Sequence, residues 1–186
     1  MVTSKRIMSP EGIEGQFTAN NLGGFLLTNL LEPASSIQFS DWDLLKSDAE
    51  IPESERGPDR TGWLPAEMLE VVDGYDGNRA YGQSKAANIL TSVEINKRWT
   101  EKAVAYSLDP GDTLTDGNRN CGGEAVVKEA MAIIHGANMK TFDQGASTTL
   151  VAALAPALNE YKHNPYLSHC QFGQAADWAT DKNATE

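Results

Sequence analysis

Apolar residues recur three or four positions apart in four stretches of the chain, a spacing that places them on one face of a helix. Ser9 followed by Pro10 is typical of a helix start, and Pro33 ends the first of these stretches. The pattern therefore predicts helices over residues 10–32, 80–101, 124–135 and 142–154.

The apolar run over residues 103–108 is short enough to be a buried strand, and a second strand is expected near residues 166–171. The first ends at Asp109-Pro-Gly111, where Pro and Gly break the extended run. No Val- or Ile-rich run of strand length lies between Pro33 and the helix predicted at 80–101.

Polar stretches separate these elements. A short helix is expected over residues 63–72. The stretch 112–123 is rich in Gly, Asn and Asp and is expected to be either a lid or a plain surface turn. The length of 186 residues predicts one domain. The connecting segments are a lead-in over 1–9, a loop region over 41–75 with an acidic part at 46–59, a tight turn at 73–77 and a frayed tail over 177–186.

Charge and composition narrow the classes of partner. A net charge of −11 and a pI near 4.7 oppose binding to nucleic acid or anionic lipid. The chain contains no run of 18 apolar residues, so no membrane span is predicted. The first residues lack the apolar core of a signal peptide, and we therefore expect a cytoplasmic protein. Cys121 and Cys170 are too isolated for a disulfide framework, and the three His residues have no metal-ligand spacing, so no metal site is expected.

Tyr81 and Lys85 lie four residues apart in the predicted helix 80–101, and therefore on one face, one turn apart. A phenol has a reference pKa of about 10, and a nearby ammonium group lowers it by favouring the phenolate. The pair suits general acid–base work at a carbonyl or alcohol carbon. The alternative is a Tyr near a helix start and a solvated Lys.

Several stretches, in this order along the chain, resemble the short-chain dehydrogenase/reductase family, in particular its retinol-dehydrogenase-like branch and related fungal members. Ala80–Leu90 is similar to the active-site helix of that family. The stretches that carry the resemblance are Glu11–Leu31, Ala80–Leu90, Ala105–Thr115, Gln144–Pro156 and Tyr166–Cys170.

The resemblance implies roles for individual residues. Tyr81 would be the proton donor and Lys85 would lower its pKa, while Asn20 would support Lys85 and a water molecule. Thr113 and Thr115 would hold the nicotinamide of NADP or NAD. Tyr81 and Lys85 would also contact this cofactor. Asp109 stands where this branch usually has His.

One further position, the Ser that polarises the substrate carbonyl in the family, has no clear match. Ser35 or Ser36 would stand in for it, or the segment is a polar turn.

The Gly-rich turn that binds the dinucleotide pyrophosphate after the first strand in this family is not found in the sequence. The chain is expected to begin about where relatives have completed four strands. The predicted fold is therefore α/β: one partial Rossmann-like domain over 1–186, rich in helices and with few parallel strands. Helices 10–32 and 80–101 would expose apolar faces, which predicts a homo-oligomer or a partner that covers them.

Two functions remain. The first is NAD(P)-dependent oxidation or reduction of a ketone or secondary alcohol, with fungal secondary metabolism as the setting that the resemblance suggests. The second is a truncated, non-catalytic relative, either a pseudoenzyme or an interaction subunit that does not bind the dinucleotide. Whether the chain is an enzyme stays open at this point.

Overall fold

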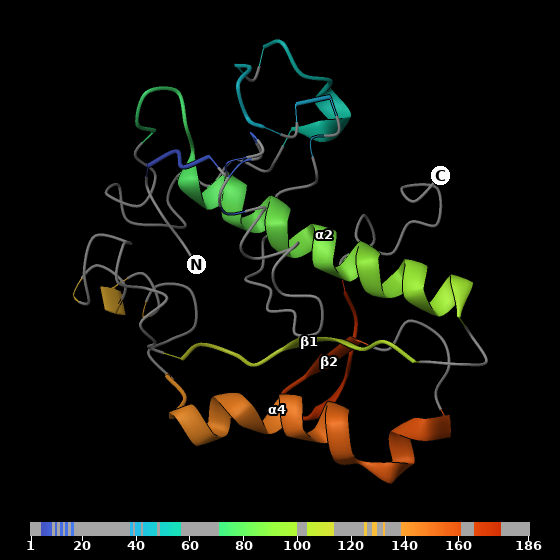
Figure 1. Ribbon diagram of the computed structural model, residues 1–186. Helices are drawn as coiled ribbons and strands as arrows, with labels where there is room; N and C mark the ends of the chain where they lie inside the picture. Colours follow the sequence, from blue (N-terminus) through green and yellow to red (C-terminus); the bar gives the residue numbers. More distant parts are fainter. Residues whose placement is uncertain are drawn as a thin grey trace.

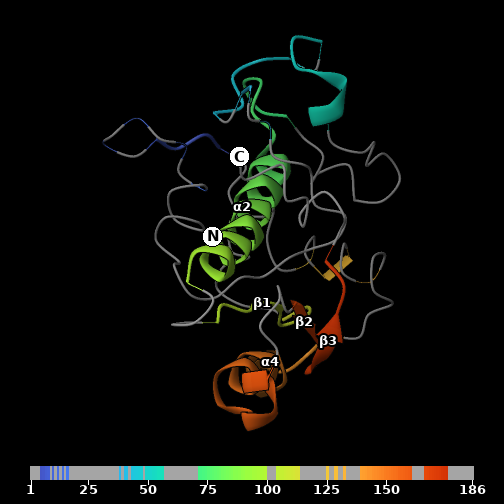
Figure 2. The same ribbon diagram turned by 90° about the vertical axis from the view of Figure 1, so that its right-hand side faces the viewer.

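A computed structural model of the chain gives an α/β fold, as predicted, in which two helices lie on opposite sides of a small sheet. Helix α2 (Gly77–Arg98) and helix α4 (Phe142–Leu154) enclose the strands in one view, and the view turned by 90° shows the same layers (Figures 1 and 2). The structure describes residues 5–8, 10, 12, 14, 16, 38, 40, 41, 43–47, 49–56, 71–99, 104–113, 125, 128, 129, 132, 139–160 and 166–175.

The sheet contains β1 (Ser107–Asp109), β2 (Tyr166–Ser168) and β3 (Gln171–Gly173) in the order β1-β2-β3. β1 and β2 run parallel, with Leu108 opposite Leu167, and β2 and β3 run antiparallel. The predicted strand 103–108 is shorter than expected, because residues 104–106 are not in the sheet. The prediction of a single strand over 166–171 is wrong, because a turn divides it into a hairpin.

This hairpin turn consists of His169 and Cys170, whose φ angles are 52° and 63°. Positive φ at both positions matches the twist of a two-residue hairpin, but Asn-Gly normally supplies it because other side chains crowd the backbone there. A contact from α4 holds the turn: the Cys170 backbone N–H donates to Thr148 Oγ1 at 3.3 Å. The turn chemistry was therefore not visible in the local sequence.

Helix α2 begins where the sequence predicted a tight turn. Asp73 and Gly74 have φ angles of 51° and 74°, and a backbone bridge joins Val72 to Tyr75. Asp76 caps the helix, because its carboxylate accepts the N–H of Arg79 at 2.9 Å. The predicted helix 80–101 is therefore confirmed, but it starts at Gly77 and ends at Arg98, each three residues earlier than predicted.

The apolar side of α2 is buried within the chain. Ile89 and Val93 form a cluster with Ala175, against which Tyr166 of β2 packs. The expectation that this helix exposes an apolar face is wrong, because the chain's own segments cover it. The apolar side chains of α2 that are buried are Ala80, Ala86, Ala87, Ile89 and Val93.

Polar side chains dock the C-terminal half of α2 onto the strand that follows it. The Asn96 side chain donates to the Ala105 carbonyl at 2.8 Å and accepts the Ala105 N–H at 2.7 Å. One helical turn earlier, the hydroxyl groups of Ser92 and Ser107 hydrogen-bond to each other. These contacts fix both the distance and the register between α2 and β1.

Helix α4 has the predicted bounds and a capping box at its start. The Thr141 hydroxyl accepts the Gln144 N–H at 3.3 Å, and the Gln144 side chain accepts the Thr141 N–H at 2.9 Å. The helix and the 3-10 turn η5 (Pro156–Glu160) close over the sheet. Their core cluster joins Leu108, Leu158 and Leu167 to the half-buried side chains of Tyr106, Val151, Ala152 and Ala155.

The chain before α2 departs from the prediction. Met8 and Glu14 form an antiparallel bridge, and Pro10, Gly12 and Glu14 are not helical, so a helix starting at Pro10 is wrong. Gln16 is helical, and residues 17–32 lie outside the described part. A short 3-10 helix, η2 (Glu53–Glu55), lies in the acidic loop.

The remaining predictions fall largely on residues that the structure does not describe. The tail over 177–186 belongs to this group, as do residues 63–70 of the helix predicted at 63–72, whose last two residues, Val71 and Val72, are described and are not helical. Within 124–135 the four described residues, Ala125, Lys128, Glu129 and Ala132, are helical. Among the described residues, no helix has both the length and the apolar character needed to cross a membrane.

Replacing Asn96 with Ala should lower the free energy of unfolding by about 1–2 kcal/mol, because two hydrogen bonds to Ala105 are lost and the better helix propensity of Ala offsets only part of the cost. Urea unfolding followed by circular dichroism measures this change. The control is Lys97→Ala in the next, exposed position, for which we expect a change within about 0.5 kcal/mol. Equal effects of the two substitutions would contradict the docking role of Asn96.

Candidate active site

A stripe of polar residues runs the length of α2 on the side that faces β1. Its members recur every three or four residues and so share one face of the helix. Four of them are at most 8% exposed, and the first is half-buried. The stripe consists of Tyr81, Lys85, Asn88, Ser92 and Asn96.

The pairing of this stripe with β1 indicates which part of the chain lies opposite its N-terminal half. The contacts from Ser92 to Ser107 and from Asn96 to Ala105 show that α2 and β1 run in opposite directions. Lys85 lies seven residues before Ser92, about 10 Å along a helix, which equals about three residues of strand. Lys85 therefore projects toward the level of Pro110, just past the end of β1.

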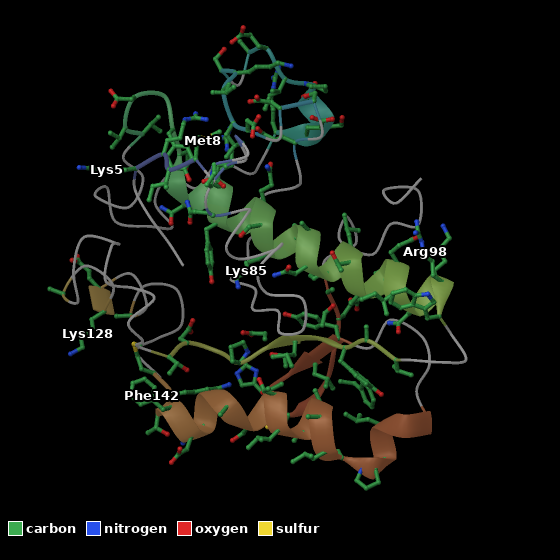
Figure 3. The ribbon with its side chains drawn as sticks, in the orientation of Figure 1. Lys5, Met8, Lys85, Arg98, Lys128 and Phe142 are labelled. Carbon is green, nitrogen blue, oxygen red and sulfur yellow. The ribbon has the colours of Figure 1, made fainter. Side chains whose placement is uncertain are left out.

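The candidate pair itself is brought together as predicted from the sequence. The Lys85 Nζ atom lies 5.4 Å from the centroid of the Tyr81 ring, within the range in which a cation is attracted to an aromatic face. Figure 3 shows Lys85 on the side of α2 that faces β1. Ammonium and phenol thus belong to one site.

The environment of Lys85 changes its acidity. Its side chain is only 8% exposed, and burial lowers the pKa of the Lys85 ammonium from its usual value because the charged form loses hydration. A poorly hydrated ammonium acts strongly on neighbouring charges. A phenolate formed on Tyr81 would be such a charge, so this geometry can promote proton transfer to and from the Tyr81 hydroxyl.

The Pro-Gly turn after β1 is held by side chains on both sides. Asp109 Oδ1 accepts the Gly111 N–H at 2.7 Å, and Lys140 Nζ donates to the Pro110 carbonyl at 2.7 Å. Gly111 has a φ of 77°, and a Cβ there would lie 2.4 Å from Lys140 Nζ. Gly is therefore required by the backbone angle, whereas the flexible end of the Lys140 side chain can move away from a Cβ.

Thr113 extends from this turn and pairs with the segment that begins α4. It forms a parallel bridge with Lys140, and its side chain packs against Gly145. Its Oγ1 atom is buried and has no hydrogen-bond partner in the described part of the chain. A buried hydroxyl without a partner is costly, and it is available to a bound polar group. The Thr113 side chain therefore fits a ligand such as a carboxamide.

A buried polar network that the sequence did not reveal secures the start of α2. The Tyr75 hydroxyl donates to Glu14 Oε1 at 2.7 Å and accepts from Gln16 Nε2 at 2.7 Å. Gln16 Nε2 also donates to the Gly77 carbonyl at 2.9 Å. The partners are 59 to 61 residues apart along the chain, so no local pattern signals them.

Tyr75, in the turn before α2, is fully buried. Burial raises the pKa of the Tyr75 phenol, and the hydrogen bond to Glu14 acts in the same direction. The Arg6 guanidinium lies 5.0 Å from the centroid of its ring and donates to the Asp43 and Leu44 carbonyls. The role of Tyr75 here is to hold three segments together at the start of α2.

Other predicted site residues lie outside the described part of the chain: Asn20, Thr115, Ser35 and Ser36. Of the predicted set, the structure therefore describes Tyr81, Lys85 and Thr113. In the part of the chain that it describes, no three His, Cys, Asp or Glu side chains converge to hold a metal ion.

Comparison with known proteins gives several related sequences. Short-chain dehydrogenase TIC 32 A, a chloroplastic protein of Brassica napus, is 29% identical over 177 residues, covering 94% of this chain and 54% of its own length. Retinol dehydrogenase 14 of Homo sapiens is 30% identical over 176 residues, covering 93% and 49%.

A fungal protein, oxidoreductase calI of Penicillium decumbens, is 31% identical over 176 residues, covering 89% of this chain and 49% of its own length. The chain thus spans about half the length of the curated relatives that it matches. No protein-family model matches the chain.

Replacing Lys85 with Met should stabilise the protein at neutral pH, because Met has a similar length and carries no buried charge. The advantage should shrink as the pH rises through the lowered pKa of Lys85. Above it the folded wild-type protein has lost this proton while the unfolded chain still binds it, so wild-type stability rises with pH. Urea unfolding of both proteins at neutral and alkaline pH measures the difference.

The matched control for this pH effect is Lys97→Met at an exposed position of the same helix. It should change stability little and with no such pH dependence. A Lys85→Met advantage that stays constant into the alkaline range would contradict a lowered pKa for Lys85.

Replacing Thr113 with Val should raise the free energy of unfolding by about 1 kcal/mol, because the substitution removes a buried hydroxyl without a partner and keeps the shape of the side chain. Thermal or urea unfolding measures this change. The control is Thr148→Val, which removes a hydroxyl that accepts the Cys170 N–H and should therefore destabilise. Destabilisation by Thr113→Val would show that its hydroxyl has a partner in solution.

Proposed function

Because the chain belongs to the short-chain dehydrogenase/reductase family over about half the length of its curated relatives, we propose that it carries the proton-transfer part of an NAD(P)-dependent oxidoreductase site. The reaction is the interconversion of a ketone and a secondary alcohol. The observation that carries the proposal is the buried Lys85 ammonium beside the Tyr81 ring, on the face of α2 that looks toward the Pro-Gly turn.

In the reductive direction, Tyr81 donates its hydroxyl proton to the carbonyl oxygen of the substrate. The Lys85 ammonium stabilises the phenolate left on Tyr81, and a proton from solvent restores the phenol. In the oxidative direction the phenolate accepts the alcohol proton. A bound nicotinamide dinucleotide supplies the hydride to the carbonyl carbon, or accepts it from the alcohol carbon.

The nicotinamide end of such a cofactor has one suitable group among the described residues. The buried, unpartnered Oγ1 of Thr113 would hydrogen-bond to a carboxamide there. Asn20 and Thr115 are proposed to assist, Asn20 at Lys85 and Thr115 at the nicotinamide. Asp109 brings a carboxylate to the same turn, but Gly111 and Ser168 both donate hydrogen bonds to it, which partly satisfies its charge.

The finer identity of the substrate is proposed from the relatives. Two of them are fungal proteins named as an oxidoreductase and a short-chain dehydrogenase/reductase, from Penicillium decumbens and Penicillium roqueforti. These names give no substrate, and we propose a ketone of fungal secondary metabolism, the setting that the family resemblance suggests, as the class to test first in a cytoplasmic protein.

A second function is proposed as the alternative. Under that alternative the chain is a non-catalytic relative that acts through its surfaces. The two functions differ in whether the folded chain binds NADPH or NADH.

The test is a titration of the purified protein with NADPH and NADH, followed by nicotinamide fluorescence, together with a turnover assay on a panel of ketones. We expect saturable binding and turnover. Tyr81→Phe should lower turnover by about 100-fold or more while cofactor affinity stays the same, because only the proton donor is removed. Tyr106→Phe is the control, since the Tyr106 hydroxyl donates to the Leu158 carbonyl and has no proposed role in proton transfer.

If the wild-type protein and Tyr81→Phe both bind the cofactor but neither turns over any ketone, the chain is a cofactor-binding pseudoenzyme and not an enzyme. Failure of a well-folded protein to bind either reduced cofactor would overturn the oxidoreductase proposal. It would leave the non-catalytic relative as the function.

A further inference from the structure

The carbonyl of Gly77 joins two parts of the molecule that are distant along the chain. Helix α2 is α-helical from Gly77, so this carbonyl accepts the backbone N–H of Tyr81 four residues later. It also accepts a hydrogen bond from the side-chain amide of Gln16 at 2.9 Å. A carbonyl oxygen has two lone pairs and can accept from both donors. The Gln16 side chain is therefore bonded to the same oxygen as the backbone of Tyr81.

The Gln16 amide is itself held by a buried network. Its Nε2 donates to the Tyr75 hydroxyl at 2.7 Å, and that hydroxyl donates to Glu14 Oε1 at 2.7 Å. The same carboxylate oxygen accepts the Gln16 N–H at 2.9 Å. Gln16 and Tyr75 are 0% exposed and Glu14 is 1% exposed. The three residues thus form a ring of hydrogen bonds that is shielded from water, where such bonds are stronger.

The first turn of α2 is where such an anchor has the largest effect. The first N–H groups of a helix lack a partner within the helix, and the turn frays unless other groups hold it. Asp76 caps this turn from its own segment, and Gln16 holds it from a segment 61 residues away (Figures 1 and 2). Tyr81 lies one turn further along the helix, so a displacement of the first turn moves its hydroxyl.

We propose that Gln16 is a positioning residue for Tyr81, and that Tyr75 and Glu14 hold the Gln16 amide in place. The inference rests on the proposed function, in which Tyr81 is the proton donor. Gln16 acts through the Gly77 carbonyl and not on the substrate itself. Because a displacement of about 1 Å remote from the chemistry can cost about 100-fold in rate, the network contributes to turnover as well as to stability.

Two substitutions remove parts of the network and keep the shape of the side chains. Gln16→Met removes the amide that bonds to Gly77, and Tyr75→Phe removes the hydroxyl that holds this amide. Gln16→Met should lower kcat by about tenfold or more, because Tyr81 loses its place. Tyr75→Phe should have a smaller effect in the same direction, because the bond from Gln16 to Gly77 remains.

The kinetic measurement must separate positioning from a loss of folded protein. Turnover is therefore expressed per cofactor-binding site, at a temperature at which circular dichroism shows each variant to be folded. Affinity for NADPH should stay within about twofold of the wild-type value, since the proton donor and not the cofactor site is displaced. Tyr106→Phe is the matched control: it also removes a phenol hydroxyl, one that donates to the Leu158 carbonyl, and should leave kcat unchanged.

A second measurement needs neither cofactor nor turnover. Lys85 Nζ lies 5.4 Å from the centroid of the Tyr81 ring, so the ring current should shift the NMR signals of the Lys85 ε-methylene group. In Gln16→Met these signals should move toward those of the exposed Lys97, because the ring is displaced. In Tyr106→Phe they should stay where they are in the wild-type protein.

The outcomes distinguish this inference from the proposed function. If the wild-type protein neither binds cofactor nor turns over a ketone, but Gln16→Met loses the Lys85 shift, the placement of Tyr81 by Gln16 stands and the oxidoreductase proposal fails. A folded Gln16→Met that keeps the wild-type kcat or the wild-type Lys85 signals would overturn the inference. So would an equal fall in kcat in Gln16→Met and Tyr106→Phe, which would assign the loss to general destabilisation.

Tyr75→Phe decides the question if Gln16→Met does not fold. This variant keeps the aromatic ring, over which the Arg6 guanidinium lies at 5.0 Å from the centroid. A fall in kcat together with a change in the Lys85 signals would support the inference. Wild-type values of both in Tyr75→Phe would overturn it.

Discussion

The docking of α2 on β1 through polar side chains is the contact on which the candidate site depends. Asn96 satisfies both backbone groups of Ala105, and Ser92 meets Ser107, so the helix has one register on the strand. An apolar contact would tolerate sliding by part of a turn, whereas a pair of directional hydrogen bonds does not. Because α2 is continuous from Gly77 to Arg98, this register extends to Tyr81 and Lys85 at its other end.

The parts of the fold that could be predicted from the sequence are those specified by residues close together in the chain. Helix α4 was predicted from the spacing of its apolar residues, and Thr141 and Gln144 at its start cap it. The turn before α2 was predicted from Asp73-Gly74. The placement of Tyr81 and Lys85 on one face follows from their spacing alone. In each case the residues that specify the structure lie within one or two turns of it.

The parts that could not be predicted depend on partners distant along the chain. Glu14 looked like a residue of a helix, but its carboxylate accepts a hydrogen bond from Tyr75, and the segment before Gln16 bends back to Met8 instead. The buried Thr113 hydroxyl without a hydrogen-bond partner could not be predicted from the sequence either, because it depends on which residues from other segments lie around it. The buried face of α2 was predicted to be exposed for the same reason.

The hairpin turn of His169 and Cys170 has a consequence for the order in which the sheet assembles. Neither residue favours positive φ, so the turn does not form readily by itself, and a hydrogen bond from Thr148 of α4 helps to hold it. Strands β2 and β3 are neighbours in sequence and would ordinarily pair first during folding. We therefore expect β3 to pair with β2 only once α4 is in place, and the edge of the sheet to open before its centre when the native state fluctuates.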